Sequence, residues 1–168
     1  MYTLTDSLPY MLNMIAAYLE DAFAAELADL ELTVPMFRVL AALLERPDQR
    51  LGELGVMTRT ESSTLSRLIG VMKNRRLVLR RRQKNDERSL QISLTPEGRA
   101  LIERLVPRAV YYENLAVRNF ERASVDELKD VLHKIQGNVA GLRAFAGSRV
   151  SVDVTAKRTP EKTTAAKK

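Results

Sequence analysis

The side chains best suited to chemistry in this sequence are basic, and they gather in one short segment. Residues 75–88 contain seven Arg or Lys and two acidic side chains, so the segment carries a net charge of +5. Like charges at this density repel one another unless a polyanion compensates them. The segment therefore predicts a surface that binds nucleic acid, although a charged face that only water solvates would have a similar composition.

A predicted helix at 60–74 comes directly before this basic segment. Its apolar residues 65, 68, 69 and 72 share one face, and the opposite face carries Ser62, Ser63, Ser66, Arg67 and Gly70. Such a small, polar and basic face can enter the major groove of DNA. We also expect the first backbone N–H groups of this helix to be free to bind a phosphate. A solvent-exposed polar face is the alternative interpretation.

Residues 77–94 predict a two-stranded β-hairpin with a basic loop at 80–88. The segment 89–94 alternates strictly, which places Leu90, Ile92 and Leu94 on one face. A hairpin tip that carries Arg reaches a minor groove well. Asp86 lies two residues before Arg88, where it could pair with the guanidinium and orient it. Asp86 could instead be a turn residue that bonds its own backbone.

The elements that must position these side chains are helices. Periodic apolar residues predict helices at 8–30, from 33 to before Pro47, at 51–57, at 96–121 and at 124–147. Pro107 should kink the helix in which it lies. Ser7 and Thr95 are the expected hydroxyl N-caps of helices 8–30 and 96–121, and Thr33-Val34-Pro35 is expected to begin the helix that ends before Pro47. Ser124 and Glu127 form a further capping box, and Thr58, Thr60 and Glu61 are alternatives for helix 60–74.

Composition excludes several classes of function. The 168 residues include no Cys, no Trp and one His, which rules out disulfides, thiolate metal sites and thiol redox switches and leaves little material for acid–base catalysis. We expect His133 to lie at a surface or an interface rather than bind a metal. No cofactor and no enzymatic activity are predicted. No apolar run is long enough to cross a membrane and no signal peptide is evident, so we expect a cytoplasmic protein.

Charge is distributed unevenly along the chain. The overall net charge is +6, yet residues 1–37 contain six acidic side chains and no basic one. The segment 156–168 contains five basic side chains and one acidic one, a net charge of +4. We predict that 150–168 is a basic disordered tail that follows a single domain at 1–149. The acidic start is expected to face away from DNA.

Six stretches together resemble the multiple-antibiotic-resistance-regulator (MarR) family of transcription factors. They are LTVPMFRVL (32–40), GEL (52–54), SSTLSRLIGVM (62–72), RLVLRR (76–81), NDERSLQISL (85–94) and LTPEGR (94–99). The resemblance, which covers about residues 8–146, implies a mainly α (α+β) fold. A winged helix-turn-helix at about 33–94 with a two-stranded β-wing would carry an N- and C-terminal helical dimerisation platform, formed by helices 8–30, 96–121 and 124–147.

The resemblance also assigns contacts to double-stranded DNA. The family's groove contacts match Ser62, Ser63, Thr64, Ser66 and Arg67, and its wing contacts match Asp86 and Arg88. Together with neighbouring hydroxyl and basic residues, the expected DNA-binding set is Thr60, Ser62, Ser63, Thr64, Ser66, Arg67, Lys73, Arg76, Arg82, Lys84, Asp86 and Arg88.

Three positions depart from the family pattern. Arg76 and Arg59 stand where Gly is usual, and Gly55 stands where Ala is usual. A non-Gly residue in the left-handed conformation is strained by roughly 1–2 kcal/mol. Arg76 is therefore expected either to end its helix differently or to contribute a phosphate contact, and the turn that contains Arg59 is not settled by the resemblance.

The family's regulators often bind a small aromatic or anionic effector in a cleft between the dimerisation helices and the winged helix. The candidate residues here are Tyr10, Met14, Tyr18, Met36, Phe37 and Arg38, with Arg38 as the counter-charge of an anion. Ordinary core and dimer contacts, with Arg38 in a structural ion pair, are the alternative.

The combined prediction is a homodimeric, sequence-specific DNA-binding regulator. We expect a repressor that binds a pseudo-palindromic operator and is released by a small ligand. The alternative is a non-specific architectural DNA-binding protein, which the Lys-rich tail would favour.

Overall fold

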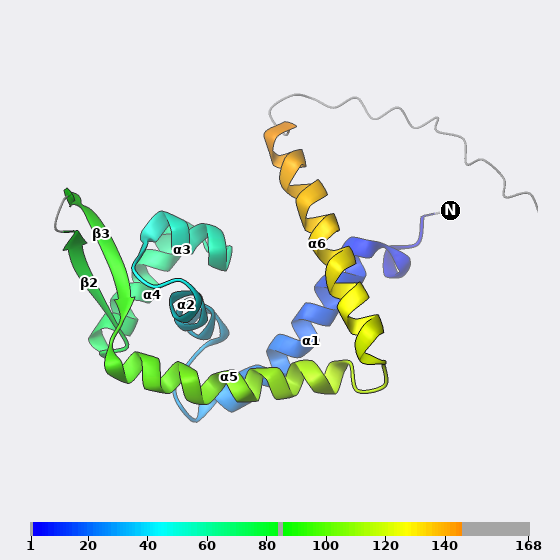
Figure 1. Cartoon of the computed structure of the whole chain (residues 1–168), viewed down its shortest axis with the longest axis horizontal. Helices are drawn as coiled ribbons and strands as arrows, with labels where there is room; N and C mark the ends of the chain where they lie inside the picture. The colour runs from blue at the N-terminus through cyan, green and yellow to red at the C-terminus, as the bar shows by residue number, and fades with distance from the viewer. Residues whose placement is uncertain (1, 84–85, 146–168) are drawn as a thin grey trace, which may run out of the picture. The chain divides into compact units, whose positions relative to one another are not determined.

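A computed structural model describes residues 2–83 and 86–145, with the side chains of 82–89 and 141–145 left out of the description. Contacts divide the chain into two compact units, one ending at Arg118 and one beginning at Asn119, and each is described by itself. The elements are a 3₁₀ turn (Leu4–Asp6), α1 (Leu8–Ala28), α2 (Val34–Glu45), β1 (Gln49–Arg50), α3 (Leu51–Thr58), α4 (Ser62–Asn74), β2 (Val78–Gln83), β3 (Asp86–Leu94), α5 (Pro96–Ala116) and α6 (Arg122–Phe145) (Figure 1).

The helices α2, α3 and α4 and the hairpin β2–β3 follow the order of a winged helix-turn-helix, which confirms the predicted fold class. We call the segment from Val34 to Leu94 the winged-helix body. Helix α4 contacts α3 on one side and β2 on the other. Helix α5 starts at the foot of the hairpin and extends toward α1, against which it packs (Figure 1).

The sheet has a strand that the sequence did not reveal. Its order is β1-β3-β2 with antiparallel neighbours, and Gln49 of β1 lies opposite Ile92 of β3. A two-residue strand carries too little pattern to be recognised from sequence, because only its partner strand defines it. The predicted two-stranded sheet is thus three-stranded at its base.

The hairpin strands are also longer than expected. Residues 80–83 and 86–89, predicted as a loop, belong to β2 and β3, with Arg82 opposite Leu90 and Gln83 opposite Asp86 after a shift of register. Charged residues are compatible with paired strands where a hairpin extends into solvent and neither face is buried. Accordingly Ile92 is buried while Leu90 is half exposed, so the predicted common face is buried only near the base.

The core contains side chains of the winged-helix body together with side chains of α1 and α5. Leu65, Ile69 and Met72 of α4 are fully buried, as their spacing predicts, and Leu68 packs at the edge. They meet other buried side chains from α1, α2, α3, the hairpin and α5, among them Leu27, Leu40, Leu43, Leu54, Val78, Ile92, Ile102 and Leu105. This core fixes which face of α4 is left for solvent.

Of the predicted N-caps, Thr95 is confirmed, and Ser7 and Ser124 are wrong. The Thr33 and Thr95 hydroxyls accept hydrogen bonds from the backbone N–H groups of Met36 and Gly98, at 3.4 and 2.9 Å. Ser7 stands before α1, but its hydroxyl donates to the Leu4 carbonyl because a 3₁₀ turn precedes it. Ser124 lies inside α6, which begins at Arg122, and so cannot cap it.

Helix α5 ends at Ala116, five residues earlier than predicted, and it runs unbroken through Pro107. At its start, Gly98 lies directly against the chain entering β2. A Cβ atom at residue 98 would lie 1.9 Å from the Leu77 carbonyl oxygen. The Thr95 hydroxyl adds a hydrogen bond of 2.6 Å to the Arg76 carbonyl. The sequence LTPEG thus fastens α5 to the base of the hairpin.

Arg59 and Arg76 keep the left-handed conformation that suits Gly. Their φ angles are 54° and 57°. The N–H of Leu77 bonds the Met72 carbonyl and the N–H of Arg76 bonds the Lys73 carbonyl, both at 2.9 Å, which is a Schellman end to α4. The expectation that Arg76 might end the helix differently is therefore wrong. Each arginine instead sustains backbone strain of about 1 kcal/mol.

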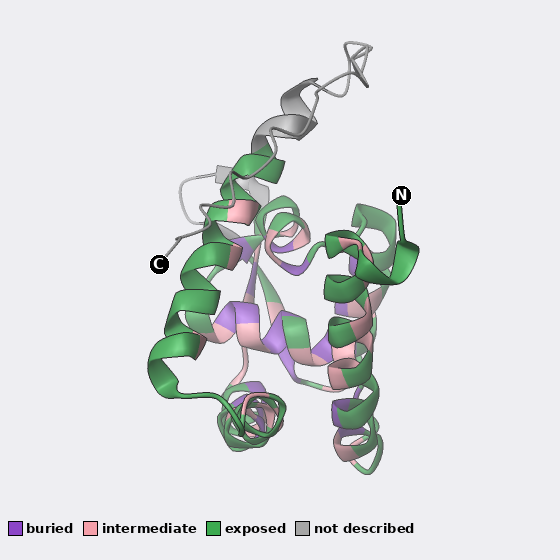
Figure 2. Ribbon diagram, turned by 90° about the vertical axis from the view of Figure 1, so that its right-hand side faces the viewer, coloured by how far each residue is buried: buried purple, intermediate pink, exposed green. Residues whose placement is uncertain are grey.

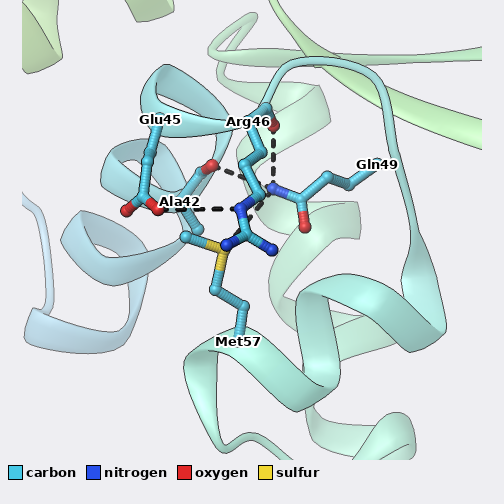
Figure 3. Close-up of polar contacts among 5 residues, drawn as sticks. All are labelled: Ala42, Glu45, Arg46, Gln49 and Met57. Carbon is cyan, nitrogen blue, oxygen red and sulfur yellow. Dashed lines mark hydrogen bonds and ion pairs between the residues drawn. The ribbon is translucent and has the colours of Figure 1, made fainter. Parts of the chain in front are cut away.

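Gln49 connects α2 to α3 from within the body. Its side chain is buried, and its Nε2 donates to the carbonyls of Ala42 and Arg46, both at 2.8 Å, beside the Met57 sulfur at 3.7 Å (Figure 3). Both carbonyls lie at the end of α2, and that of Ala42 also accepts the backbone N–H of Arg46, at 2.9 Å. Nothing in the sequence pattern had distinguished Gln49 from a surface residue.

Three helices carry apolar side chains that this single chain does not bury. The residues, which we call the exposed apolar faces, are Leu8, Met11, Leu12, Ile15 and Tyr18 of α1, Val110, Tyr111 and Leu115 of α5, and Leu128, Val131 and Val139 of α6. The described side chains of α6 are all exposed or intermediate (Figure 2). Within the described residues, no helix combines the length and the apolar character that crossing a membrane requires.

Candidate nucleic-acid interface

The outer face of α4 is positioned as the sequence predicts. Ser62, Ser63, Thr64 and Arg67 are exposed, and Ser66 is half-buried, on the side opposite the core. Lys73 is exposed in the last turn of the helix. Because α4 is held by α3 and β2, this face is presented by a rigid support rather than by a loop.

Glu61 is the N-cap of α4. The sequence had left this position open between Thr58, Thr60 and Glu61. Its carboxylate accepts hydrogen bonds from the backbone N–H groups of Ser63 and Thr64, at 2.9 and 3.1 Å, and from the Ser63 hydroxyl. The bonds from Ser63, first from its hydroxyl and then from its backbone, lower the pKa of Glu61 to about 2. The expectation that the N–H groups of this turn are free for a phosphate is wrong, because Glu61 occupies two of them.

Thr60 is turned toward the preceding loop. Its hydroxyl donates to the Thr58 carbonyl at 3.2 Å, and the buried Thr58 hydroxyl donates to the Leu54 carbonyl at 2.7 Å. These two hydroxyls close the turn between α3 and α4 and do not cap α4. Thr60 is thus less available to DNA than the neighbouring Ser62.

The basic segment divides into structural and exposed side chains. Arg75 turns inward, where its guanidinium donates to the carbonyls of Leu30, at 2.8 Å, and Glu31 beyond the end of α1. Arg80 reaches from β2 to the Ser66 carbonyl of α4, at 3.3 Å. Arg76 and Arg81 are exposed, and no contact of their guanidinium groups is described. The charge of +5 therefore overstates what DNA can meet, because Arg75 caps a helix.

Four predicted contact residues cannot be placed. Lys84 lies outside the described residues, and the side chains of Arg82, Asp86 and Arg88 lie outside the description as well. The proposed pairing of Asp86 with Arg88 therefore stays a prediction.

The six candidate effector residues lie on two helices, three on α1 and three on α2. Met36 is buried, Phe37 packs edge-on against Phe23 with ring centroids 4.7 Å apart, and Arg38 forms an ion pair with Glu20. Tyr18 is exposed, while Tyr10 and Met14 are half-buried on α1. These contacts match the alternative interpretation, in which Arg38 forms a structural ion pair.

A cavity of about 320 Å³ lies instead between the end of α1 and α5. It is lined by Glu26, Asp29, Leu30, Leu101, Arg104, Leu105 and Arg108. Glu26 accepts a hydrogen bond of 2.6 Å from Arg108 and one of 3.1 Å from the Tyr112 hydroxyl, which raises the pKa of Tyr112. Two acidic side chains of α1, Glu20 and Glu26, thus form ion pairs with Arg38 of α2 and Arg108 of α5.

Metal-binding arrangements are absent from the part of the chain that the structure describes. No group of three or more His, Cys, Asp or Glu side chains there could hold a metal ion. His133 lies exposed on α6.

Comparison with protein families gives a match over residues 22–105, to the family described as transcriptional regulator SarA/Rot. The chain is also similar to the HTH-type transcriptional regulator SarZ of Staphylococcus aureus (strain MRSA252). The two are 31% identical over 114 residues, which is 68% of this chain and 74% of SarZ.

Solved structures with the same fold include a MarR family transcriptional regulator from Silicibacter pomeroyi, 28% identical with a TM-score of 0.74, covering 82% of this chain and 92% of that one. Bordetella bronchiseptica BpsR, whose DNA binding is regulated by 6-hydroxynicotinic acid, is 25% identical with a TM-score of 0.73, covering 81% and 97%. A MarR family regulator from Listeria monocytogenes in complex with 26mer DNA shares the fold, at 21% identity and a TM-score of 0.78, covering 92% and 99%.

Proposed function

The chain belongs to the SarA/Rot and MarR-type family of winged-helix transcriptional regulators, and from this premise we propose that it is a homodimeric repressor of a pseudo-palindromic operator. Each α4 would enter the major groove of one half-site, and each hairpin would approach the adjacent minor groove. We propose that the protein acts in the cytoplasm and has no enzymatic activity.

The observation that carries this proposal is the outer face of α4. It presents hydroxyl groups and Arg67 to solvent while α3 and β2 hold the helix from behind. Arg67 is exposed with no described acidic partner, so its guanidinium is available to bind guanine or a phosphate. The other contacts that we propose are the remaining eleven residues of the set predicted from the sequence, with the hairpin contributing Arg82, Lys84, Asp86 and Arg88.

The exposed apolar faces support the proposed homodimer. Apolar side chains that a chain leaves uncovered in this number mark a protein–protein interface. A second copy would bury them and would also supply the second α4 that a pseudo-palindrome requires. We propose that α1, α5 and α6 form this platform within one domain at 1–149, which the basic segment 150–168 follows.

We further propose that a small anionic or aromatic ligand releases the repressor. Arg38 is the candidate counter-charge. Met36 and Phe37 precede it on α2, and Tyr10, Met14 and Tyr18 lie on α1 with its partner Glu20. A carboxylate ligand would have to replace Glu20 as the partner of Arg38. BpsR, with its hydroxynicotinic acid effector, is a relative in fold for which such control is described.

An architectural DNA-binding protein is the second candidate, and the basic tail is the observation that favours it. Deleting residues 150–168 separates the two proposals. An architectural protein should lose most of its affinity for DNA, whereas a regulator should keep its preference for one site.

The proposed function is tested by gel shift of the full-length protein on the DNA upstream of its own gene, with random duplex as competitor. We expect a preferred site, and Arg67→Ala should weaken binding to it and reduce the salt dependence. Arg118→Ala, which removes an exposed arginine at the end of α5, is the matched control and should leave binding unchanged. Equal affinity for random duplex would reject a sequence-specific regulator.

A further inference from the structure

The Ser63 hydroxyl of α4 must act as the donor in its hydrogen bond with Glu61. An ionised carboxylate has no hydrogen to donate, so the hydrogen between the two side chains must come from Ser63. The geometry supports an ionised Glu61, because two backbone N–H groups, of Ser63 and Thr64, point at the same carboxylate oxygen. The single hydroxyl hydrogen of Ser63 is therefore already in use.

A hydroxyl whose hydrogen is engaged can only accept hydrogen bonds from outside. The Ser63 oxygen and the Glu61 carboxylate together form an exposed patch without donors at the first turn of α4. An ionised DNA phosphate offers only acceptors and carries a negative charge, so it is repelled by this patch. The patch thus excludes the usual ligand of a helix N-terminus.

The major groove offers donors at only two places. They are the exocyclic amines, N4 of cytosine and N6 of adenine, whereas guanine and thymine present acceptors there. A patch of acceptors at the start of a groove-binding helix therefore matches an amine and mismatches guanine O6 or thymine O4.

We propose that Ser63, oriented by Glu61, is a specificity-determining residue that accepts a hydrogen bond from an exocyclic amine of cytosine or adenine in each half-site. The proposal rests on the proposed function, because it requires α4 to enter the major groove. Arg67 follows Ser63 by one helical turn on the same face and carries only donors. The face thus presents acceptors and then donors along its length, which specifies an amine and a guanine or phosphate in that order.

Ser62 provides the internal comparison. It is equally exposed on the same turn, but no hydrogen bond of its side chain is described. Its hydroxyl is free to rotate, so it can donate to a phosphate as readily as it accepts from a base. Only Ser63 should discriminate between an amine and a carbonyl.

The test begins with full-length protein selecting duplexes from a random pool, and the enriched duplex is the probe. At each position of the half-site, cytosine is replaced by 2-pyrimidinone and adenine by purine, which lack only the amine. We expect one position at which this replacement weakens wild-type binding roughly 3- to 10-fold. Whether the cytosine or the adenine analogue has the effect identifies the base.

The variants then assign the effect to a side chain. Ser63→Ala should lose a similar factor on the unmodified duplex and nothing more on the analogue, whereas Ser62→Ala should remain sensitive to the analogue. Glu61→Gln, whose amide can donate to Ser63 and free its hydroxyl, should relax selection at this position toward thymine or guanine. Circular dichroism confirms that each variant keeps its helices.

The outcomes distinguish a failure of the proposed function from a failure of the role assigned to Ser63. If the wild-type protein enriches no duplex, the proposed function fails and the role of Ser63 falls with it. If a duplex is enriched but no amine replacement is coupled to Ser63→Ala, regulation of a specific site stands and the assignment of Ser63 is overturned.

Discussion

The winged-helix body and the long helices α1, α5 and α6 differ in how completely their apolar side chains are buried. In the body, Leu40, Leu54 and Ile69 are fully buried within one chain. In α1, by contrast, Ile15 is 54% exposed, and Val131 of α6 is 49% exposed. The core of the body is thus completed within one chain, with side chains of α1 and α5, whereas the exposed apolar faces lack a covering surface. The difference supports the proposal that DNA contact and dimer formation use separate parts of the chain.

Helix α5 has both buried and exposed apolar side chains. Ile102 and Leu105 in its first half are buried against the body, while Tyr111 and Leu115 in its second half are exposed. The first half of α5 is anchored to the body and its second half is exposed. A partner that binds the second half would therefore be held at a fixed position relative to the body. This arrangement would let a dimer fix the separation of two α4 helices.

The largest expected effect comes from placing a charge on an exposed apolar face. Ile15→Glu should convert the proposed dimer into a monomer, and duplex affinity should fall roughly 100-fold or more because the two half-sites are no longer bound together. Light scattering and a binding titration measure the two effects.

Val56→Glu is the matched control for this change. Val56 is 80% exposed on α3, in the body, and should leave the oligomeric state unchanged. A dimer that survives Ile15→Glu would remove α1 from the proposed platform.

Gly98→Ala tests whether the body depends on its fastening to α5. The added Cβ would overlap the Leu77 carbonyl, so we expect a loss of about 3 kcal/mol of unfolding free energy in urea. Gly52→Ala, where a Cβ meets nothing within 4 Å in α3, should be neutral or stabilising by up to about 1 kcal/mol. Equal stabilities of the two variants would show that the junction tolerates movement.

Arg59→Gly and Arg76→Gly sharpen the comparison by separating stability from binding. Each should raise the unfolding free energy by about 1 kcal/mol, because Gly adopts positive φ without strain. Each should also weaken duplex binding, because an exposed cation at one end of α4 is lost. Thermal unfolding and gel shift check the two signs.

Glu31→Gly provides the control for these arginines. Glu31 has a φ of 52° outside the body and should gain stability without losing affinity. If the arginine variants gain stability and bind DNA as the wild type does, neither side chain contacts the phosphates.

The smallest expected effect concerns the pH dependence of the α4 cap. Because the pKa of Glu61 is lowered to about 2 from 4.5, the contribution of this cap to stability is complete above pH 4.5 and is lost as the pH falls toward 2. The stability difference between wild type and Glu61→Gln should therefore shrink over that window. Carbon-13 NMR titration of the Glu61 carboxyl, with a midpoint near 4.5, would disprove the capping geometry.

Local signals predicted the elements that position the site. The apolar spacing of α4 identified its buried face, and Thr95-Pro96 identified the start of α5, because both depend on residues within one or two turns. The capping hydroxyls of Thr33 and Thr95 bond residues three positions away. Such contacts are encoded in neighbouring residues and can be inferred without knowing the fold.

The features that the sequence did not reveal depend on distant partners. The sequence places Arg75 in the basic segment that is predicted to bind DNA. In the structure its guanidinium instead donates to carbonyls 44 and 45 residues away in the chain. The strand β1 exists only through its pairing with β3. Glu61 was a local alternative, but hydroxyl residues are the more usual caps, and the charge balance of the segment gave no reason to choose it.

The most direct test of the central claim is a titration of full-length protein into its enriched duplex and into random duplex of equal length, at one salt concentration, followed by sedimentation. We predict a complex of two chains on one duplex, with affinity for the enriched sequence at least about 1,000-fold above that for the random one. Binding of single chains, or equal affinity for both duplexes, would contradict the account of a dimeric, sequence-specific regulator.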